Sequence, residues 1–121
     1  MILRTLHPED VPMMWRINEE GLPGVGKVSD EVLADLLSLA HLPLGAFEGN
    51  VLAGFVLCLL PKTRYASPNY AWFNQRYSRF LYVDRIAVSQ TCRNRQIGTL
   101  LYRDVIGHAE ERRCPVAAEV S

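Results

Sequence analysis

The chain has 121 residues, of which 49% are hydrophobic, and this suits a single globular domain with a small core. Its 13 acidic and 13 basic residues cancel, so the charge gives no support for nonspecific nucleic-acid binding, which needs a strong basic excess. The longest apolar run, residues 51–60, is too short to span a bilayer, and an odd number of cysteines without metal-ligand spacing indicates reduced thiols, so we expect no membrane segment and no metal site in a cytoplasmic protein.

The first half of the chain predicts a strand, two helices and a hairpin. Residues 2–6 predict a short strand, and a helix opens at residues 7–10, where a proline and two acids form its first turn. Residues 21–27 hold three glycines and a proline, which predicts a loop, and Ser29 is placed to cap a second helix. Gly49-Asn50 between two apolar runs is typical of a β-hairpin.

The second half begins with an aromatic-rich segment, residues 65–77, within a long connection. A long loop in a compact domain is usually functional or disordered, so we expect a lid over an acceptor site rather than a cap on the core. An apolar strand at residues 80–88 follows, then a helix from residue 97 to residue 113. Pro115 precedes a last strand at residues 116–120.

The junction between the strand at residues 80–88 and the next helix has the character of a phosphate site. A short polar loop leads into residues 93–99, which open the helix. Backbone N–H groups point outward at a helix N-terminus, the dipole there favours an anion, and Arg93 and Arg95 add positive charge. The alternative is an ordinary helix start with two solvated arginines, because short glycine-loop patterns also arise by chance.

The order of these residues resembles the acetyl-CoA signature of the GNAT (GCN5-related) N-acetyltransferases, which is an arginine or glutamine, two residues, a glycine, one residue, then glycine or alanine. Arg93, Gln96 and Gly98 occupy those places, so Gln96 stands where the first glycine is usual. Residues 84–88 and 100–102 are also of the kind that the family carries. Residues 67–73, leading into 79–85, look like a bacterial subgroup of GNAT acetyltransferases.

This resemblance implies an α/β fold in which a mixed, largely antiparallel sheet is flanked by helices. The order of the predicted elements is similar to the first two thirds of a GNAT domain, and family members normally continue with another helix and a final pair of strands. We therefore expect residues 1–121 to form a GNAT domain that is incomplete at its C-terminus. Either the chain is a fragment, or another chain, as in a homo-oligomer, covers the exposed sheet.

The resemblance also implies an N-acetyltransferase that moves an acetyl group from acetyl-CoA to an amine of a small molecule or a protein. In such an enzyme the cosubstrate would contact the strand backbone and the phosphate loop, here Ile86, Ala87, Val88, Arg93, Asn94, Arg95, Gln96, Ile97, Gly98 and Thr99. Among these, Gly98 would lie against the pyrophosphate. The alternative is a catalytically inactive remnant that binds CoA or a partner.

Acetyl transfer needs a neutral amine, so a carboxylate or a water that it orients must remove the ammonium proton. The family topology implies that Asp84 and Glu119 lie near the thioester, and Glu119 resembles the base of the ribosomal-protein-acetylating branch. For Asp84 the alternative is a salt bridge with a neighbouring arginine, and for Glu119 a solvated position near the chain end. No cysteine or serine has a recognisable base partner, so we expect direct transfer without a covalent acyl-enzyme.

Overall fold

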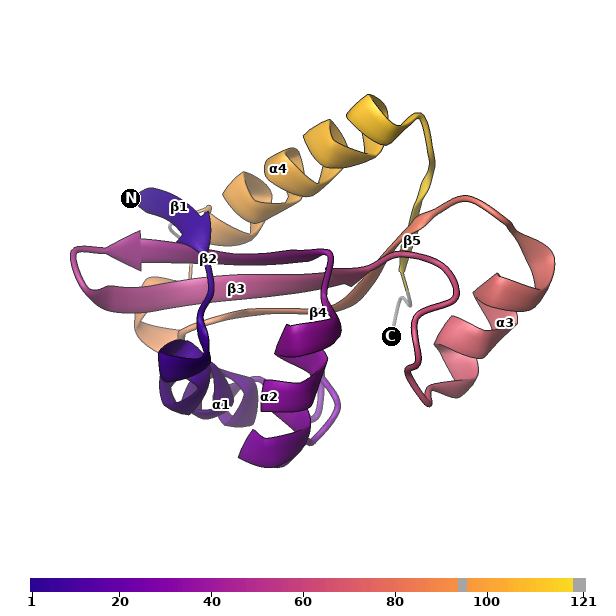
Figure 1. Ribbon diagram of the computed structural model, residues 1–121. Coiled ribbons are helices and arrows are strands. Elements are labelled where there is room, and N and C mark those ends of the chain that lie inside the picture. Colours follow the sequence, from indigo (N-terminus) through magenta and orange to yellow (C-terminus); the bar gives the residue numbers. More distant parts are fainter. Residues whose placement is uncertain (94–95, 119–121) are drawn as a thin grey trace.

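The computed structural model describes residues 1–93 and 96–118, and within them five strands form one mixed sheet in the order β1-β2-β3-β4-β5. Each of the first four strands is antiparallel to its neighbour, and β5 runs parallel to β4. The elements, shown in Figure 1, are β1 (Ile2–Thr5), α1 (Val11–Glu20), α2 (Asp30–Leu39), β2 (Leu42–Glu48), β3 (Val51–Leu59), α3 (Pro68–Arg76), β4 (Leu81–Val88), α4 (Ile97–Arg112) and β5 (Val116–Ala118). This arrangement confirms the α/β class and the mixed, largely antiparallel sheet expected from the sequence.

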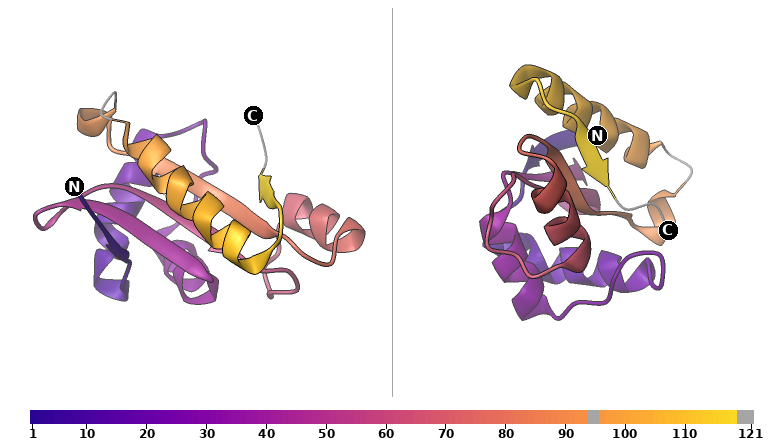
Figure 2. Two further views of the ribbon diagram at one scale, coloured as in Figure 1. Left: turned by 90° about the horizontal axis from the view of Figure 1, so that it is seen from above. Right: turned by 90° about the vertical axis from the view of Figure 1, so that its right-hand side faces the viewer.

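Both faces of the sheet are covered, α1 and α2 lying on one side and α4 on the other (Figures 1 and 2). Alternation along β3 supplies the two cores, because successive side chains of a strand point to opposite faces. Phe55, Leu57 and Leu59 join the core beneath α1 and α2, whereas Val56 and Cys58 join the core beneath α4. The sheet is therefore buried on both sides along its centre, and ligands must reach it from an end or an edge.

Local signals in the sequence form the turns and helix starts that they predict. The Ser29 hydroxyl accepts a hydrogen bond from the backbone N–H of Val32 at 3.1 Å, which caps α2. Gly49 has φ +62° in the turn between β2 and β3, a left-handed conformation that glycine adopts without steric cost. Among the residues described, no helix has the length and apolarity needed to cross a membrane.

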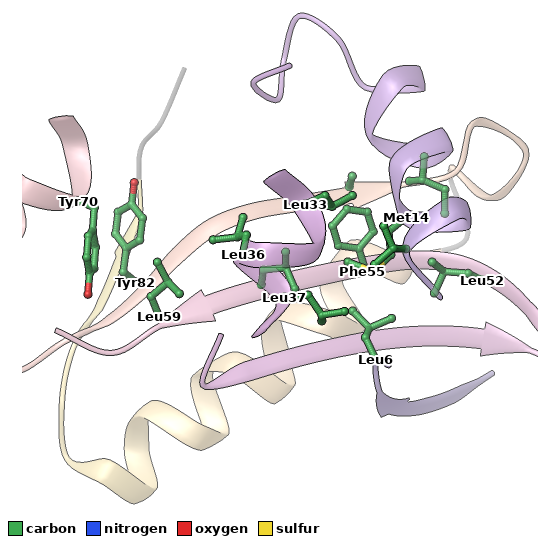
Figure 3. Packing of buried hydrophobic residues seen from close by; sticks show 14 of the residues in the cluster. Leu6, Met14, Leu33, Leu36, Leu37, Leu52, Phe55, Leu59, Tyr70 and Tyr82 are labelled. Carbon is green, nitrogen blue, oxygen red and sulfur yellow. The ribbon is translucent and has the colours of Figure 1, made fainter. Parts of the chain in front are cut away.

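The aromatic-rich segment is not the long loop that we expected, because most of it forms helix α3. Ser67 caps this helix, its hydroxyl accepting from the backbone N–H of Tyr70 at 3.4 Å. Tyr70 is buried, and its ring lies 5.2 Å from that of Tyr82 and 6.2 Å from that of Phe80, measured between centroids. Figure 3 shows Tyr70 and Tyr82 side by side in the core. The segment thus caps one end of the core, which is the alternative to a lid.

Candidate active site

The strand β4 pairs with its two neighbours over different lengths. It pairs with β3 along Tyr82 to Val88, but β5 pairs only with Leu81, Tyr82 and Val83. Figure 1 shows β5 beside one end of β4 only. Within the described part of the chain, the β5-facing edge of β4 therefore has no strand partner beyond residue 83. Such an edge can accept an extended ligand that carries amide groups, as an added strand would.

A β-bulge at Asp84 lies where the two strands part. Leu57 of β3 is paired with Arg85 and Cys58 with Val83, so Asp84 is an extra residue on β4. A bulge of this kind bends its strand and redirects a side chain. The side chain of Asp84 is 5% exposed, and the Arg85 Nε donates a hydrogen bond to its Oδ2 at 2.8 Å. The salt bridge that the sequence left open as an alternative is thus present.

Arg85 also joins β4 to the first helix and to the loop after it. Its Nη1 donates to the side-chain oxygen of Asn18 and to the carbonyl of Gly26, each at 3.0 Å, and the Asn18 amide donates to that same carbonyl at 3.1 Å. Asn18 is fully buried. Because a buried guanidinium is costly unless its donors are paired, this network holds the loop of residues 21–29 against β4.

The Asp84 carboxylate therefore lies in a walled space. A cavity of about 220 Å³ is lined on the loop side by Gly24, Val25 and Gly26, and on the sheet and α4 side by Val83, Asp84, Arg85, Ile86, Tyr102 and Ala118. Sequence reasoning did not single out Asn18 or Arg85 for this site. The available signal was a polar Asn18 on the same helical face as Val11 and Met14.

Tyr65, in the segment between β3 and α3, lies close to this carboxylate. Burial is the main cause that raises the pKa of the Tyr65 hydroxyl, the charge of Asp84 and a hydrogen bond with Asp84 raise it further, and Arg85 acts in the opposite direction. Its ring packs 5.8 Å from that of Tyr70. A neutral phenol beside a carboxylate can donate to the carboxylate and accept from an N–H group at the same time. The sequence marked Tyr65 only as one aromatic among several.

The predicted phosphate loop borders a second cavity, of about 310 Å³, at the N-terminus of α4. It is lined by Val88, Cys92, Arg93, Gln96, Ile97, Gly98 and Thr99. A Cβ added at Gly98 would meet nothing within 4 Å, so there is open space above this glycine. Gln96 has φ +58°, the left-handed conformation that a glycine in its place would adopt without strain.

Two contacts fix the loop before α4 to the end of α1. The Arg93 Nη2 donates to the backbone carbonyl of Glu20 at 3.2 Å, and the Glu20 carboxylate accepts from the backbone N–H of Gln90 at 2.9 Å. A guanidinium has five N–H donors, so one contact with a carbonyl is compatible with binding a phosphate as well. Arg93 is thus held at the rim of the cavity, where the sequence placed it.

The two cavities lie along the same strand, because Ile86 of β4 lines the first and Val88 of β4 lines the second. The structure thus brings together Asp84, the strand residues and the described part of the phosphate loop. Asn94, Arg95 and Glu119, also predicted to take part in the site, lie outside the described residues.

Comparison with known proteins agrees with this geometry. The family model for the acetyltransferase (GNAT) family matches residues 11–121. A search of curated proteins finds no match to this sequence.

Solved structures with this fold include the ribosomal-protein-alanine N-acetyltransferase of Brucella melitensis biovar Abortus 2308, with 22% identity, 99% of this chain and 79% of that chain covered, and a TM-score of 0.70. The aminoglycoside antibiotic 6'-N-acetyltransferase of Acinetobacter haemolyticus is 13% identical, and the match covers 100% of this chain and 80% of that chain with a TM-score of 0.72. A third structure, AAC(6')-Iy in complex with a CoA bisubstrate analog, is 18% identical, and the match covers 99% of this chain and 79% of that chain with a TM-score of 0.68.

At these identities the likeness to solved structures shows the fold alone. The family model spans most of the sequence, and the chain therefore belongs to the acetyltransferase (GNAT) family, whose members transfer an acetyl group from acetyl-CoA.

Proposed function

We propose that this chain binds acetyl-CoA along β4 and transfers its acetyl group directly to an amine. The observation that carries the proposal is the β5-facing edge of β4 from Asp84 to Val88. This edge runs from one cavity to the other, and no strand of the described structure pairs with it. A strand rises about 3.3 Å per residue, so this edge is roughly 13 Å long. That length suits an extended arm whose amides pair with the backbone of Ile86, Ala87 and Val88.

The phosphates of the cosubstrate would lie in the cavity at the start of α4. The first N–H groups of a helix have no partners within the helix, and they carry the positive end of its dipole. Arg93 adds a charge at the rim of this cavity, and the absence of a side chain at Gly98 leaves room for a pyrophosphate. These features support the predicted roles of the described loop residues, Arg93, Gln96, Ile97, Gly98 and Thr99.

The carbonyl carbon of the thioester would then lie near Asp84. In the proposed reaction the acceptor nitrogen loses a proton to the Asp84 carboxylate, directly or through a water, and forms the C–N bond as the C–S bond breaks. The departing thiolate takes a proton from water. Glu119 is the second proposed base, carried by the family resemblance. We also propose a cytoplasmic location, because the three cysteines are an odd number and lack metal-ligand spacing.

Calorimetric titration with CoA tests the cosubstrate site. A tryptophan at Gly98 would enter the cavity, so Gly98→Trp should abolish measurable binding. Gly107→Trp is the matched control, because Gly107 lies in the same helix, also with open space around its Cβ position, and does not line the cavity. Equal affinity in the two variants would remove the proposed site.

A second candidate function is a module that binds CoA without turnover, and the Asp84–Arg85 contact at 2.8 Å favours it. A carboxylate that is paired with a buried guanidinium stabilises the fold, and this role explains the presence of Asp84 without any catalysis. Release of free thiol from acetyl-CoA in the presence of amines separates the two functions. CoA binding without any amine-dependent thiol release would support the non-catalytic module.

A further inference from the structure

We infer that the acceptor is an amine attached to an uncharged, apolar body, and that this body binds in a third cavity, between α2 and the segment that follows β3. The inference rests on the proposed acetyl transfer and adds the class of acceptor. Three observations carry it: the residues that line the cavity, the ion pair in its wall whose two charges offset each other, and the interaction of Tyr65 with Asp84.

The third cavity has a volume of about 570 Å³, which lies within the range of roughly 300–1,000 Å³ that is usual for small-molecule sites. It is lined by Val32, Asp35, Leu36, Arg64, Tyr65 and Ala66. Leu36 belongs to the packed core together with Leu59 and Tyr82, so this part of the wall is rigid (Figure 3). Val32 is half exposed to solvent. An apolar ligand would remove that surface from water, which favours binding.

The charged residues of this wall neutralise each other. Arg64 donates two hydrogen bonds to the Asp35 carboxylate, from Nη2 to Oδ1 at 3.0 Å and from Nη1 to Oδ2 at 3.3 Å. The guanidinium lowers the pKa of Asp35, so the carboxyl stays ionised and paired. Among the described residues lining the cavity, Asp35 is the single carboxylate, and its charge is offset by Arg64. A polycation such as an aminoglycoside would therefore find no carboxylate without a cationic partner among the described residues of this wall.

Tyr65 connects this cavity to the place of reaction. Tyr65 lines the third cavity, and its hydroxyl interacts with Asp84, which lines the cavity beside the β4 edge that has no strand partner among the described residues beyond residue 83. An acceptor with its body against Val32 and Leu36 can therefore extend its nitrogen past Tyr65 toward Asp84. The phenol oxygen can accept a hydrogen bond from that nitrogen, which makes Tyr65 a positioning residue for the amine.

The test compares 2-phenylethylamine with sisomicin, an aminoglycoside, as acceptors at saturating acetyl-CoA. We expect kcat/KM for 2-phenylethylamine to exceed that for sisomicin by at least about tenfold, the size of discrimination that apolar pockets give. The variant Ala66→Trp fills the cavity and should raise the KM for 2-phenylethylamine by about tenfold or more. Ala71→Trp is the matched control, because Ala71 is also an exposed alanine and does not line the cavity.

Two further measurements make the outcomes distinct. The Kd for CoA should be the same in the parent chain, Ala66→Trp and Ala71→Trp, because the cavity lies apart from the phosphate loop. Tyr65→Phe should raise the KM for the amine without changing the Kd for CoA. A preference for sisomicin, or an unchanged KM in Ala66→Trp, would overturn the acceptor assignment while the proposed transferase function stands. Failure of all the proteins to bind CoA would instead overturn the proposed function and the assignment with it.

Discussion

The guanidinium of Arg85 donates a hydrogen bond to the side-chain oxygen of Asn18 across 3.0 Å, although the two residues are 67 positions apart in the chain. Both residues are buried. The contact links β4, which carries Asp84, to α1, and through Gly26 to the loop that walls the first cavity. A polar pair inside the fold thus sets the shape of the space in which the acetyl group is proposed to lie.

Replacing Asn18 should lower the stability of the whole domain. In Asn18→Leu the Arg85 guanidinium loses an acceptor, and the Gly26 carbonyl loses a donor, both inside the protein. Arg85 and the Gly26 carbonyl still bond to each other, so the variant loses two buried hydrogen bonds, one of them to a charged group. We therefore expect the free energy of unfolding to fall by about 2–4 kcal/mol. Urea denaturation monitored by circular dichroism gives this value. A loss below about 0.5 kcal/mol, typical of a surface position, would mean that the network is not stabilising.

Removing the carboxylate of Asp84 should reduce turnover without affecting CoA binding. The amide of Asp84→Asn retains an oxygen that can accept the hydrogen bond from Arg85, so the fold is kept while the base is lost. A general base contributes about 10²–10⁴-fold, and kcat should fall by a factor in this range. The thiol-release assay on Asp84→Asn and Glu119→Gln measures it. If kcat falls only in Glu119→Gln, then Glu119 and not Asp84 is the base.

The left-handed backbone of Gln96 predicts that glycine is the better residue at this position. A non-glycine residue in this region costs roughly 1–2 kcal/mol, so Gln96→Gly should raise the melting temperature. Arg113, at the other end of α4, has φ +54° and is a matched position. We expect Arg113→Gly to raise the melting temperature as well, but only Gln96→Gly to tighten CoA binding, because only Gln96 lines the phosphate cavity. Lower melting temperatures in both variants would contradict the strain argument.

Close packing around Gly54 predicts that no side chain fits there. A Cβ at this position would lie 3.0 Å from both the Ala87 carbonyl oxygen and the Ile97 Cγ2. Gly54→Val should therefore cost about 1–3 kcal/mol of stability and shift the start of α4 away from β4. Thermal melting and CoA titration report the two effects. Gly107→Ala, at an open helical position, is the control and should be neutral or stabilising.

Stability should decline at alkaline pH because burial raises the pKa of Cys58 to about 12, with the charge of Asp84 as a second cause. The thiol of the unfolded chain ionises near its ordinary value of 9.0, so the folded form binds more protons above that pH. The stabilising contribution is thus present below about pH 9 and is lost progressively between pH 9 and 12. Burial is also the main cause that raises the pKa values of Tyr65 and Tyr102. Their ionisation therefore lowers the stability of the folded protein further as the pH rises.

Urea titrations of the parent chain and Cys58→Ala between pH 8 and pH 11 isolate the thiol. The absolute stability of Cys58→Ala will be lower because the substitution leaves a cavity, so the slope with pH is the quantity to compare. We expect a steeper decline in the parent chain. Equal slopes would show that Cys58 ionises as readily in the folded protein as in the unfolded chain.

Signals that act over a few residues were sufficient to predict much of the fold and the phosphate loop. Ser29 caps the helix that it was expected to cap, Gly49 forms the predicted hairpin turn, and Gly98 opens onto a cavity at a helix start. These outcomes depend on capping bonds, backbone sterics and helix-end charges, which are set by neighbours in the chain. Helix α3 was missed although Ser67 and Pro68 mark its start, because it buries only Tyr70 fully and so lacks a clear apolar face.

Local patterns in the chain predicted the family, the position of the phosphate loop and the order of the elements except for α3, because these patterns involve residues that are neighbours in the chain. The surroundings of the reactive groups depend instead on contacts between residues that are distant in the chain. The bulge at Asp84, its salt bridge with Arg85 and the position of Tyr65 depend on how β3 pairs with β4 and on how distant loops pack onto that pair. The register of β3 on β4 and the hydrogen bond between Arg85 and Asn18 both join residues that are distant in the chain. Such contacts form when the whole core is buried, and no hydrophobic periodicity in the sequence predicts them.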